Sequence, residues 1–489
     1  MPDRLSALDA SFLHLEEGGA HMHVASVLVF DGSPPPYDEL VAAIEGRLHL
    51  VPRYRQRLAY VPFGQGRPVW ADDPHFNARY HIRHTALPAP GTDAELKKLA
   101  GRLFAQALDR SKPLWELWLV ENLDDDRFAV ISKTHHALVD GVSGVDLISV
   151  LFDVSPEPAA GGPPESPWIP RPAPSDTQLL ADALLERAVV PGEIVRGLRR
   201  LTRTPRDVVG RLAEGLAGVG AMAWAGLNPA PPSVLNVPIG PHRRYTWVDA
   251  DLPEFKAIKD GLGGTINDVV LTSVALALGA FLRDRGEDTD DLVLKAMVPV
   301  SVRVDAEAGA LGNRVAAMYA PLPVGITDPE LCFATIHTAM LGLKESGQAV
   351  GAQALTQLAE FAPPTIMSQA ARLQSRQRFF NLVVTNVPGP QFELFLLGRP
   401  LSRLYPVVPI AQAQALGIAI MSYHGRLGYG LLGDFDAIPD LEGLATHLQT
   451  AIGALAAAAG LPPSSGVTRP RRRRAAGRSE PSAPAPAPS

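Results

Sequence analysis

The sequence predicts a mixed α/β protein made of two large lobes, and three observations support this prediction. The chain has 489 residues, 46% of them hydrophobic, which is enough apolar material for two sizeable cores. Segments typical of strands and of helices alternate along both halves of the chain. Pro-rich stretches at 155–175 and 228–244 divide the halves, because neither a helix nor a strand persists through such a composition.

The first lobe is expected over residues 1–154. Strands are expected where β-branched and aromatic residues form short runs or alternate with polar ones, and helices where apolar residues recur at helical spacing. In chain order these segments are a strand at 23–32, a helix at 37–48, a strand at 80–87, a helix at 93–108, strands at 115–123 and 126–136, and a helix at 142–154.

A Pro-rich linker and helical connector is expected over 155–240, and a second lobe over 241–461. The apolar stretch at 269–282 is shorter than the roughly 18–20 residues of a membrane span, so a buried helix is expected there. Residues 462–489 are rich in arginine, proline and alanine and predict a disordered basic tail. Strand signals in the second lobe recur at 292–304, 313–324, 379–389, 415–425 and 426–435.

Charge and cysteine content limit the function classes. Lysine and arginine total 45 against 51 acidic residues, so the net charge of -6 gives no reason to expect a nucleic-acid partner. The single cysteine, Cys332, excludes an intramolecular disulfide and a cysteine-based zinc site and suits a cytoplasmic location. The N-terminal segment does not resemble a secretory signal. Nothing in the sequence indicates the oligomeric state.

Two basic segments could contact an anionic membrane. The stretch at 178–227 alternates apolar residues with arginines, and the tail carries RPRRRR at 469–474. A solvated helix face and a solubilising tail explain them as well.

Two adjacent histidines precede an Asp-Gly turn signal in KTHHALVDGVSG at 133–144, between a predicted strand and a predicted helix. Adjacent strand residues point to opposite faces, so His135 and His136 do not readily ligate one ion, and no metal site is expected. A neutral imidazole at a strand end can act as a general base when a local acceptor holds its other nitrogen. The alternative is a histidine with only a structural role, either at the end of a strand or packed in the core.

HHALVDG resembles the HHxxxDG signature of the CoA-dependent acyltransferase superfamily, which includes chloramphenicol acetyltransferase and peptide-synthetase condensation domains. Within it, the chain up to about Leu461 is similar to the bacterial wax ester synthase/diacylglycerol acyltransferases. The further matching stretches are LSALDASFLHLE at 5–16, PLW at 113–115, TINDVVL at 265–271, PVSVR at 299–303, LGNR at 311–314 and NVPGP at 386–390.

The resemblance implies two chloramphenicol-acetyltransferase-like lobes with a tunnel between them and the HHxxxDG loop near its middle. It implies that His136 is the general base and that His135 lies beside it in the site. It also implies that Asp140 is structural and pairs with Arg303. The Asp-Gly signal itself indicates that Asp140 and Gly141 shape the turn that fixes both histidines. An arginine that serves only as a solvated strand-end charge is the alternative for Arg303.

Three further residues resemble family positions that support the site. Asn267 and Asp268 begin a predicted helix, where ordinary N-capping explains them as well. Asn386 ends a strand that could border the tunnel, and a plain turn is the alternative. Trp115 of PLW and Cys332 are expected to be packed core residues.

The implied reaction is transfer of a long-chain fatty acyl group from acyl-CoA to diacylglycerol or to a fatty alcohol, with His136 as the base. No cofactor is expected, because acyl-CoA is itself a substrate. Lipid acceptors would place the protein at the inner membrane or at lipid droplets as a peripheral protein. Two alternatives remain: a non-catalytic lipid-droplet-associated relative, and an acyltransferase of the same superfamily that uses another alcohol or an amine.

Overall fold

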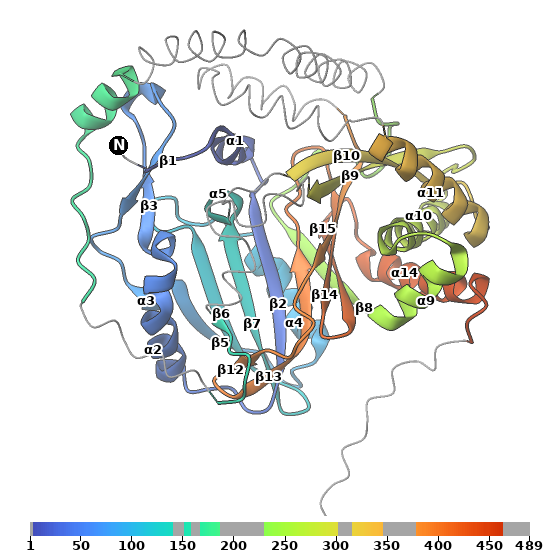
Figure 1. The fold of residues 1–489 in the computed structure, drawn as a ribbon, viewed down its shortest axis with the longest axis horizontal. Helices are drawn as coiled ribbons and strands as arrows, with labels where there is room; N and C mark the ends of the chain where they lie inside the picture. The colour runs from blue at the N-terminus through green and yellow to red at the C-terminus, as the bar shows by residue number, and fades with distance from the viewer. Residues whose placement is uncertain are drawn as a thin grey trace, which may run out of the picture.

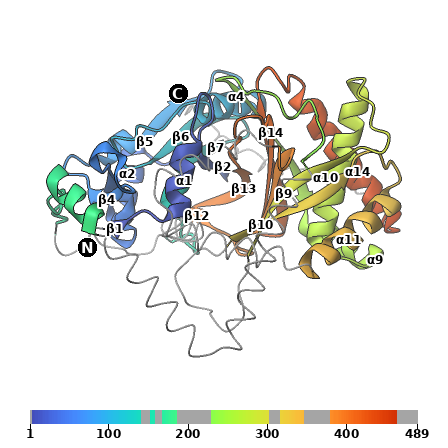
Figure 2. The same ribbon diagram turned by 90° about the horizontal axis from the view of Figure 1, so that it is seen from above.

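A computed structural model of the chain describes residues 3–139, 151–157, 167–185, 229–301, 315–345 and 378–462. Two six-stranded sheets lie side by side, and helices surround them (Figures 1 and 2). The mixed α/β fold with two lobes, predicted from the sequence, is confirmed.

The first sheet carries His135 at the end of a central strand, and His136 follows it directly. In spatial order it consists of β12 (Phe395–Leu396), β13 (Arg399–Val407), β2 (His23–Asp31), β7 (Arg127–His135), β6 (Trp115–Leu123) and β5 (Ile82–Ala86). Only β5 and β6 are parallel neighbours within it. Successive side chains point to opposite faces, so Val27 and Ile131 belong to a core shared with the second lobe, whereas Leu28 and Val130 belong to a separate core.

The second sheet is mixed. In spatial order it consists of β10 (Val315–Pro323), β9 (Val293–Ser301), β11 (Leu382–Pro388), β14 (Leu416–Tyr423), β15 (Arg426–Asp434) and β8 (Arg243–Asp251). The strand β11 runs parallel to both β9 and β14, and the other neighbours are antiparallel.

Four helices cover one face of the second sheet (Figure 1). They are α9 (Leu252–Leu262), α10 (Ile266–Asp284), α11 (Pro329–Glu345) and α14 (Leu441–Ala458). Within the described ranges, α10 is the one helix long and apolar enough to cross a membrane, but 78% of its apolar window is buried in the protein. It therefore has the burial of a core helix, as the sequence predicts for 269–282.

The first lobe contains the other helices and a small third sheet. The helices are α1 (Ala7–Leu15), α2 (Tyr37–Arg47), α3 (Ala78–His81), α4 (Asp93–Phe104) and α5 (His136–Val139), with an unlabelled one at 176–185 and short 3-10 turns at Leu48–Leu50, Pro52–Arg55 and Pro62–Gly64. The third sheet has the order β1 (Asp3–Arg4), β4 (Val69–Asp72), β3 (Gln56–Ala59).

The helix α4 connects the lobes by packing against β8. Its Gly101 allows this close approach, because a Cβ at that position would lie only 2.8 Å from the carbonyl oxygen of Arg243. A capping box fixes the start of α4, since Glu95 Oε2 accepts a hydrogen bond of 2.9 Å from the backbone N–H of Thr92.

One pair of strands departs from the boundary expected at 241. The sequence assigns 395–407 to the second lobe, whereas β12 and β13 complete the first sheet, with β13 antiparallel to β2 from Leu401 opposite Phe30 to Val407 opposite Ala25. A strand pattern in the sequence does not show which strand it will pair with, because only the tertiary fold decides which sheet has a free edge.

Most expected segments match observed elements to within a few residues. The clearest local difference is at 80–87, where a turn of helix, capped by Asn77 Oδ1 accepting from Arg79 N at 3.0 Å, precedes β5. The helix expected at 93–108 ends at Phe104. Most of the helix expected at 142–154, most of the 155–240 connector, and all but the first residue of the 462–489 tail lie outside the described residues.

Candidate active site

The two histidines stand at the junction of β7 and α5, on the inner end of the first sheet. His135 is the last residue of the strand and His136 the first of the helix. Their backbone N–H groups donate to different segments, that of His135 to Leu114 O at 2.9 Å and that of His136 to Met22 O at 2.8 Å. The chain direction changes between them, so the two imidazoles enter different surroundings.

The imidazole of His135 is buried and contacts neighbouring residues of the first lobe. Its side chain is 1% exposed, and its Nδ1 accepts a hydrogen bond of 3.0 Å from the backbone N–H of Ala137. Because Nδ1 accepts, the ring proton of the neutral form is on Nε2. That nitrogen lies 3.2 Å from Oε1 of Glu16.

His136 has the surroundings of an uncharged imidazole. Its ring stacks on Phe12 of α1 with ring centroids 3.9 Å apart and an interplanar angle of 24°. Burial, with a smaller contribution from His135, lowers the pKa of His136 from 6.5 to about 4. Its Nδ1 is buried and has no hydrogen-bond partner within the described part of the chain. The side chain is neutral at physiological pH and can accept a proton.

Glu16, which follows α1, is a charged residue of this region that the sequence analysis did not single out. Its Oε1 accepts a hydrogen bond of 2.7 Å from Met22 N, and its Oε2 pairs with the guanidinium of Arg110, whose Nε is 3.2 Å away. Burial alone would raise the pKa of Glu16, but hydrogen bonding and charge from His135, together with Arg110, outweigh it and hold this pKa well below its usual range. The carboxyl group is therefore a permanent anion.

Two further histidines extend the cluster from the start of β2. His23 lies opposite His135 in the strand register, and its Nε2 is 3.6 Å from Glu16 Oε1. Burial lowers the pKa of His23 well below 6.5, and His21 stacks on its ring at a centroid distance of 5.4 Å. The sequence signal was HMH at 21–23, in which His21 lies just before β2 and His23 begins it.

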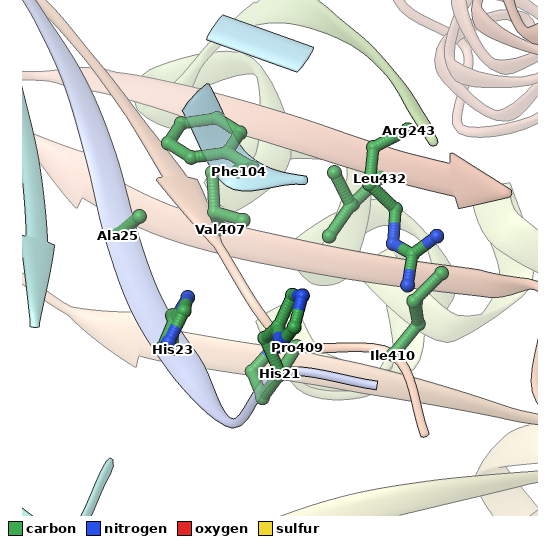
Figure 3. Close-up of a pocket in the computed structure, with 9 residues that line it drawn as sticks. All are labelled: His21, His23, Ala25, Phe104, Arg243, Val407, Pro409, Ile410 and Leu432. Atoms are coloured by element: carbon green, nitrogen blue, oxygen red, sulfur yellow. The ribbon is translucent and has the colours of Figure 1, made fainter. Parts of the chain in front are cut away.

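These histidines open onto a pocket between the lobes (Figure 3). Its empty volume is ≈ 270 Å³. The wall is formed by β2 and the loop before it, by α4, by β13 and the loop after it, and by β8 and β15 of the second sheet. Its residues are His21, His23, Ala25, Phe104, Arg243, Val407, Pro409, Ile410 and Leu432. Its polar groups lie on opposite sides, with His21 and His23 on the first lobe and Arg243 on the facing wall, and apolar side chains lie between them (Figure 3).

The arginine of this pocket holds the lobes together. Arg243 Nη1 donates to Gly240 O at 2.7 Å and to His242 O at 2.8 Å, and its Nη2 donates to Gly19 O of the first lobe. Asp434 Oδ2 lies 3.5 Å from Nη1 and balances the charge. Because its guanidinium already makes these contacts, the role of Arg243 is structural.

Three of the predicted site residues lie outside the described residues: Asp140, Gly141 and Arg303. Their roles, and the pairing of Asp140 with Arg303, stay predictions.

Asn267 and Asp268 stand at the N-terminus of α10, as the sequence predicts. Thr265 and Asp268 form a capping box in which Asp268 Oδ2 accepts from Thr265 N at 2.8 Å. The same oxygen lies 2.9 Å from Nδ1 of His337 on α11. The carboxylate of Asp268 is thus used to begin one helix and to attach another, whereas Asn267 beside it is half-buried.

Asn386 lies half-buried on β11 opposite Ile420, close to a tight turn. Gly389, just after this strand, allows a close approach to β14, because a Cβ there would lie 2.3 Å from Ser422 O. Trp115 and Cys332 are buried, as expected. The indole N–H of Trp115 donates to Tyr54 O at 2.8 Å.

Family models and relatives of known name match nearly the whole chain. The family model of the wax ester synthase/diacylglycerol acyltransferase catalytic domain matches residues 5–270, and that of the corresponding C-terminal domain matches residues 311–456. Two relatives from Mycobacterium tuberculosis are each named a probable diacylglycerol O-acyltransferase. One is 32% identical, with 93% of this chain and 96% of the relative covered, and the other is 34% identical, with 94% and 100% covered.

Solved structures are also similar to most of the chain. The wax ester synthase/diacylglycerol acyltransferase from Marinobacter aquaeolei VT8 is similar with a TM-score of 0.65 and 26% identity, covering 94% of this chain and 100% of that one. The starter condensation domain of rhizomide synthetase has a TM-score of 0.56 at 16% identity, with 94% of each chain covered, and this likeness concerns the fold alone.

Proposed function

Because this chain belongs to the wax ester synthase/diacylglycerol acyltransferase family, we propose that it transfers a long-chain fatty acyl group from acyl-CoA to the free hydroxyl of diacylglycerol, with fatty alcohols as second acceptors. The observation that carries the proposal is the neutral, half-buried imidazole of His136 directly after the end of β7. The named activities of the relatives support the substrate class.

His136 acts as the general base in this mechanism. Its Nδ1 is buried, so Nε2 is the nitrogen that a substrate reaches. As the acceptor oxygen forms a bond to the thioester carbon, its proton passes to the imidazole. When the tetrahedral intermediate collapses, the carbon–sulfur bond breaks and the imidazolium returns the proton to the departing CoA thiolate.

The depressed pKa of His136 suits the second half of this cycle. An imidazolium formed in a site that disfavours charge is a strong acid, so it readily protonates the thiolate. The first half depends on holding both substrates in line, because a weak base needs a well-placed alcohol. No cofactor is required, since acyl-CoA brings the acyl group as a substrate.

The acceptors are lipids, so we propose that the protein works from the cytoplasm as a peripheral protein at the inner membrane or a lipid droplet. The exposed aromatic side chains of Tyr60 and Phe63, at one edge of the first lobe, support contact with a lipid surface.

The test is transfer of radiolabelled palmitoyl-CoA to diolein and, separately, to hexadecanol by the full chain and by His136→Ala. Label is expected in acylglycerol, and the variant is expected to lose about 100-fold or more in rate. His84→Ala removes an exposed histidine that pairs with Glu121 and is the matched control. Equal rates for His136→Ala and the control would refute the role of His136. An inactive wild type would favour another alcohol, an amine, or a non-catalytic lipid-binding protein.

A further inference from the structure

The carboxylate of Glu16 is the centre of a buried set of contacts directly behind the histidine motif. It accepts hydrogen bonds from the backbone N–H of Met22 and from the guanidinium of Arg110, and its Oε1 lies 3.2 Å from Nε2 of His135. Three separate segments of the first lobe therefore meet at one side chain: the loop before β2, the end of β7, and the loop after α4.

Three connections lead from Glu16 to His136. The first runs through Met22, whose N–H donates to Glu16 and whose carbonyl accepts the N–H of His136 at 2.8 Å. The second runs through His135, which precedes His136 in the chain and turns its Nε2 to Glu16. The third runs through α1, which ends just before Glu16 and carries Phe12, the residue stacked on the His136 ring.

Arg110 fixes the end of α1 as well as the carboxylate. Its Nη2 donates both to Glu16 and to Leu13 O, the latter at 3.0 Å, so the guanidinium ties the last turn of α1 to its own loop. Removing the carboxylate would leave the buried Met22 N without its acceptor and the partly exposed Arg110 without its anion. Groups left in that state are costly, so the surrounding segments would move to find new partners.

We infer that Glu16 is a positioning residue for the acyl transfer, which holds the His136 imidazole in place through Met22, His135 and Phe12. This inference rests on the proposed function of His136 as the base. Glu16 itself touches no reacting atom, and its effect on the reaction passes through the position of His136.

The experiment compares Glu16→Ala, Glu16→Gln and a matched control in the palmitoyl transfer assay. The control is Asp72→Ala on the small third sheet, which removes a buried carboxylate that likewise pairs with an arginine, Arg171, and accepts its backbone N–H at 2.9 Å. We expect Glu16→Ala to lower kcat about 100-fold, the loss typical of a displaced catalytic group, with little change in KM for acyl-CoA. Glu16→Gln keeps an acceptor for Met22 N and should lose less.

A cycle with His136→Ala separates this inference from the proposed function. If Glu16 acts only through His136, adding Glu16→Ala to His136→Ala lowers the residual rate no further. Full activity of the single variant His136→Ala would overturn the role of His136 as the base, on which this inference rests. A rate for Glu16→Ala equal to that of Asp72→Ala, or full additivity in the cycle, would overturn the role of Glu16 alone.

Discussion

Lowering the pH from 7 to 5 should destabilise the protein through His136. Burial lowers the pKa of this imidazole to about 4 in the folded state, whereas the unfolded chain has the ordinary value of 6.5. Between these two values the unfolded chain binds a proton that the folded protein does not bind. The stability contributed by the neutral ring is therefore complete above pH 6.5 and is lost as the pH falls toward 4.

The size of the effect follows from the two pKa values. Each unit of difference corresponds to about 1.4 kcal/mol. At pH 5 the unfolded chain is almost fully protonated at this site and the folded protein is mostly not, so the free energy of unfolding should fall by about 2 kcal/mol relative to pH 7.

Urea unfolding at the two pH values measures this loss. The comparison is with His136→Phe, which keeps a ring against Phe12 but does not titrate. All ionisable groups other than residue 136 are present in both proteins, so their contributions cancel in the difference. We expect the wild type to lose about 2 kcal/mol more than the variant. Equal losses would refute the conclusion that His136 is buried in its neutral form.

Three other outcomes follow from contacts described above. Asp268→Asn should lower the free energy of unfolding by about 1 kcal/mol by weakening the cap of α10 while leaving kcat unchanged, and a fall in kcat would return Asp268 to the site. Gly101→Ala should cost about 1–3 kcal/mol in a denaturant titration, because its Cβ would press on the Arg243 carbonyl, and wild-type stability would contradict this contact. Cys332 should resist iodoacetamide at pH 8 in the native protein, since burial raises the pKa of its thiol to about 12, and rapid labelling would contradict this burial.

Much of the fold could be predicted because most strands and helices form where the local sequence pattern favours them. The strands containing Trp115 and His135 carry dense apolar runs, and their observed bounds differ from the expected ones by at most one residue. The strand β8 at 243–251 was not predicted, because RRYTWVDAD mixes charged and aromatic residues and follows a Pro-rich stretch. Its place at the sheet edge, paired only with β15, tolerates that composition.

The candidate site could be predicted only in part. The pattern around His136 was sufficient to locate a strand end, because the turn signal lies close in the sequence. The pairing of Glu16 with Arg110 was not found, although Glu16 ends the matching stretch at 5–16, since 94 residues separate the two side chains. Long-range ion pairs of this kind become visible only when the fold brings the segments together.

The crossing of β13 into the first sheet affects how the chain is made. During synthesis β2 has one open edge until residue 407 has left the ribosome, so the sheet that carries His136 stays incomplete while most of the protein is translated. Pairing across such a distance is slow, and an unpaired central strand invites association with other chains. Producing the two halves as separate polypeptides would therefore yield a first half that aggregates unless the second is present to supply its missing strand.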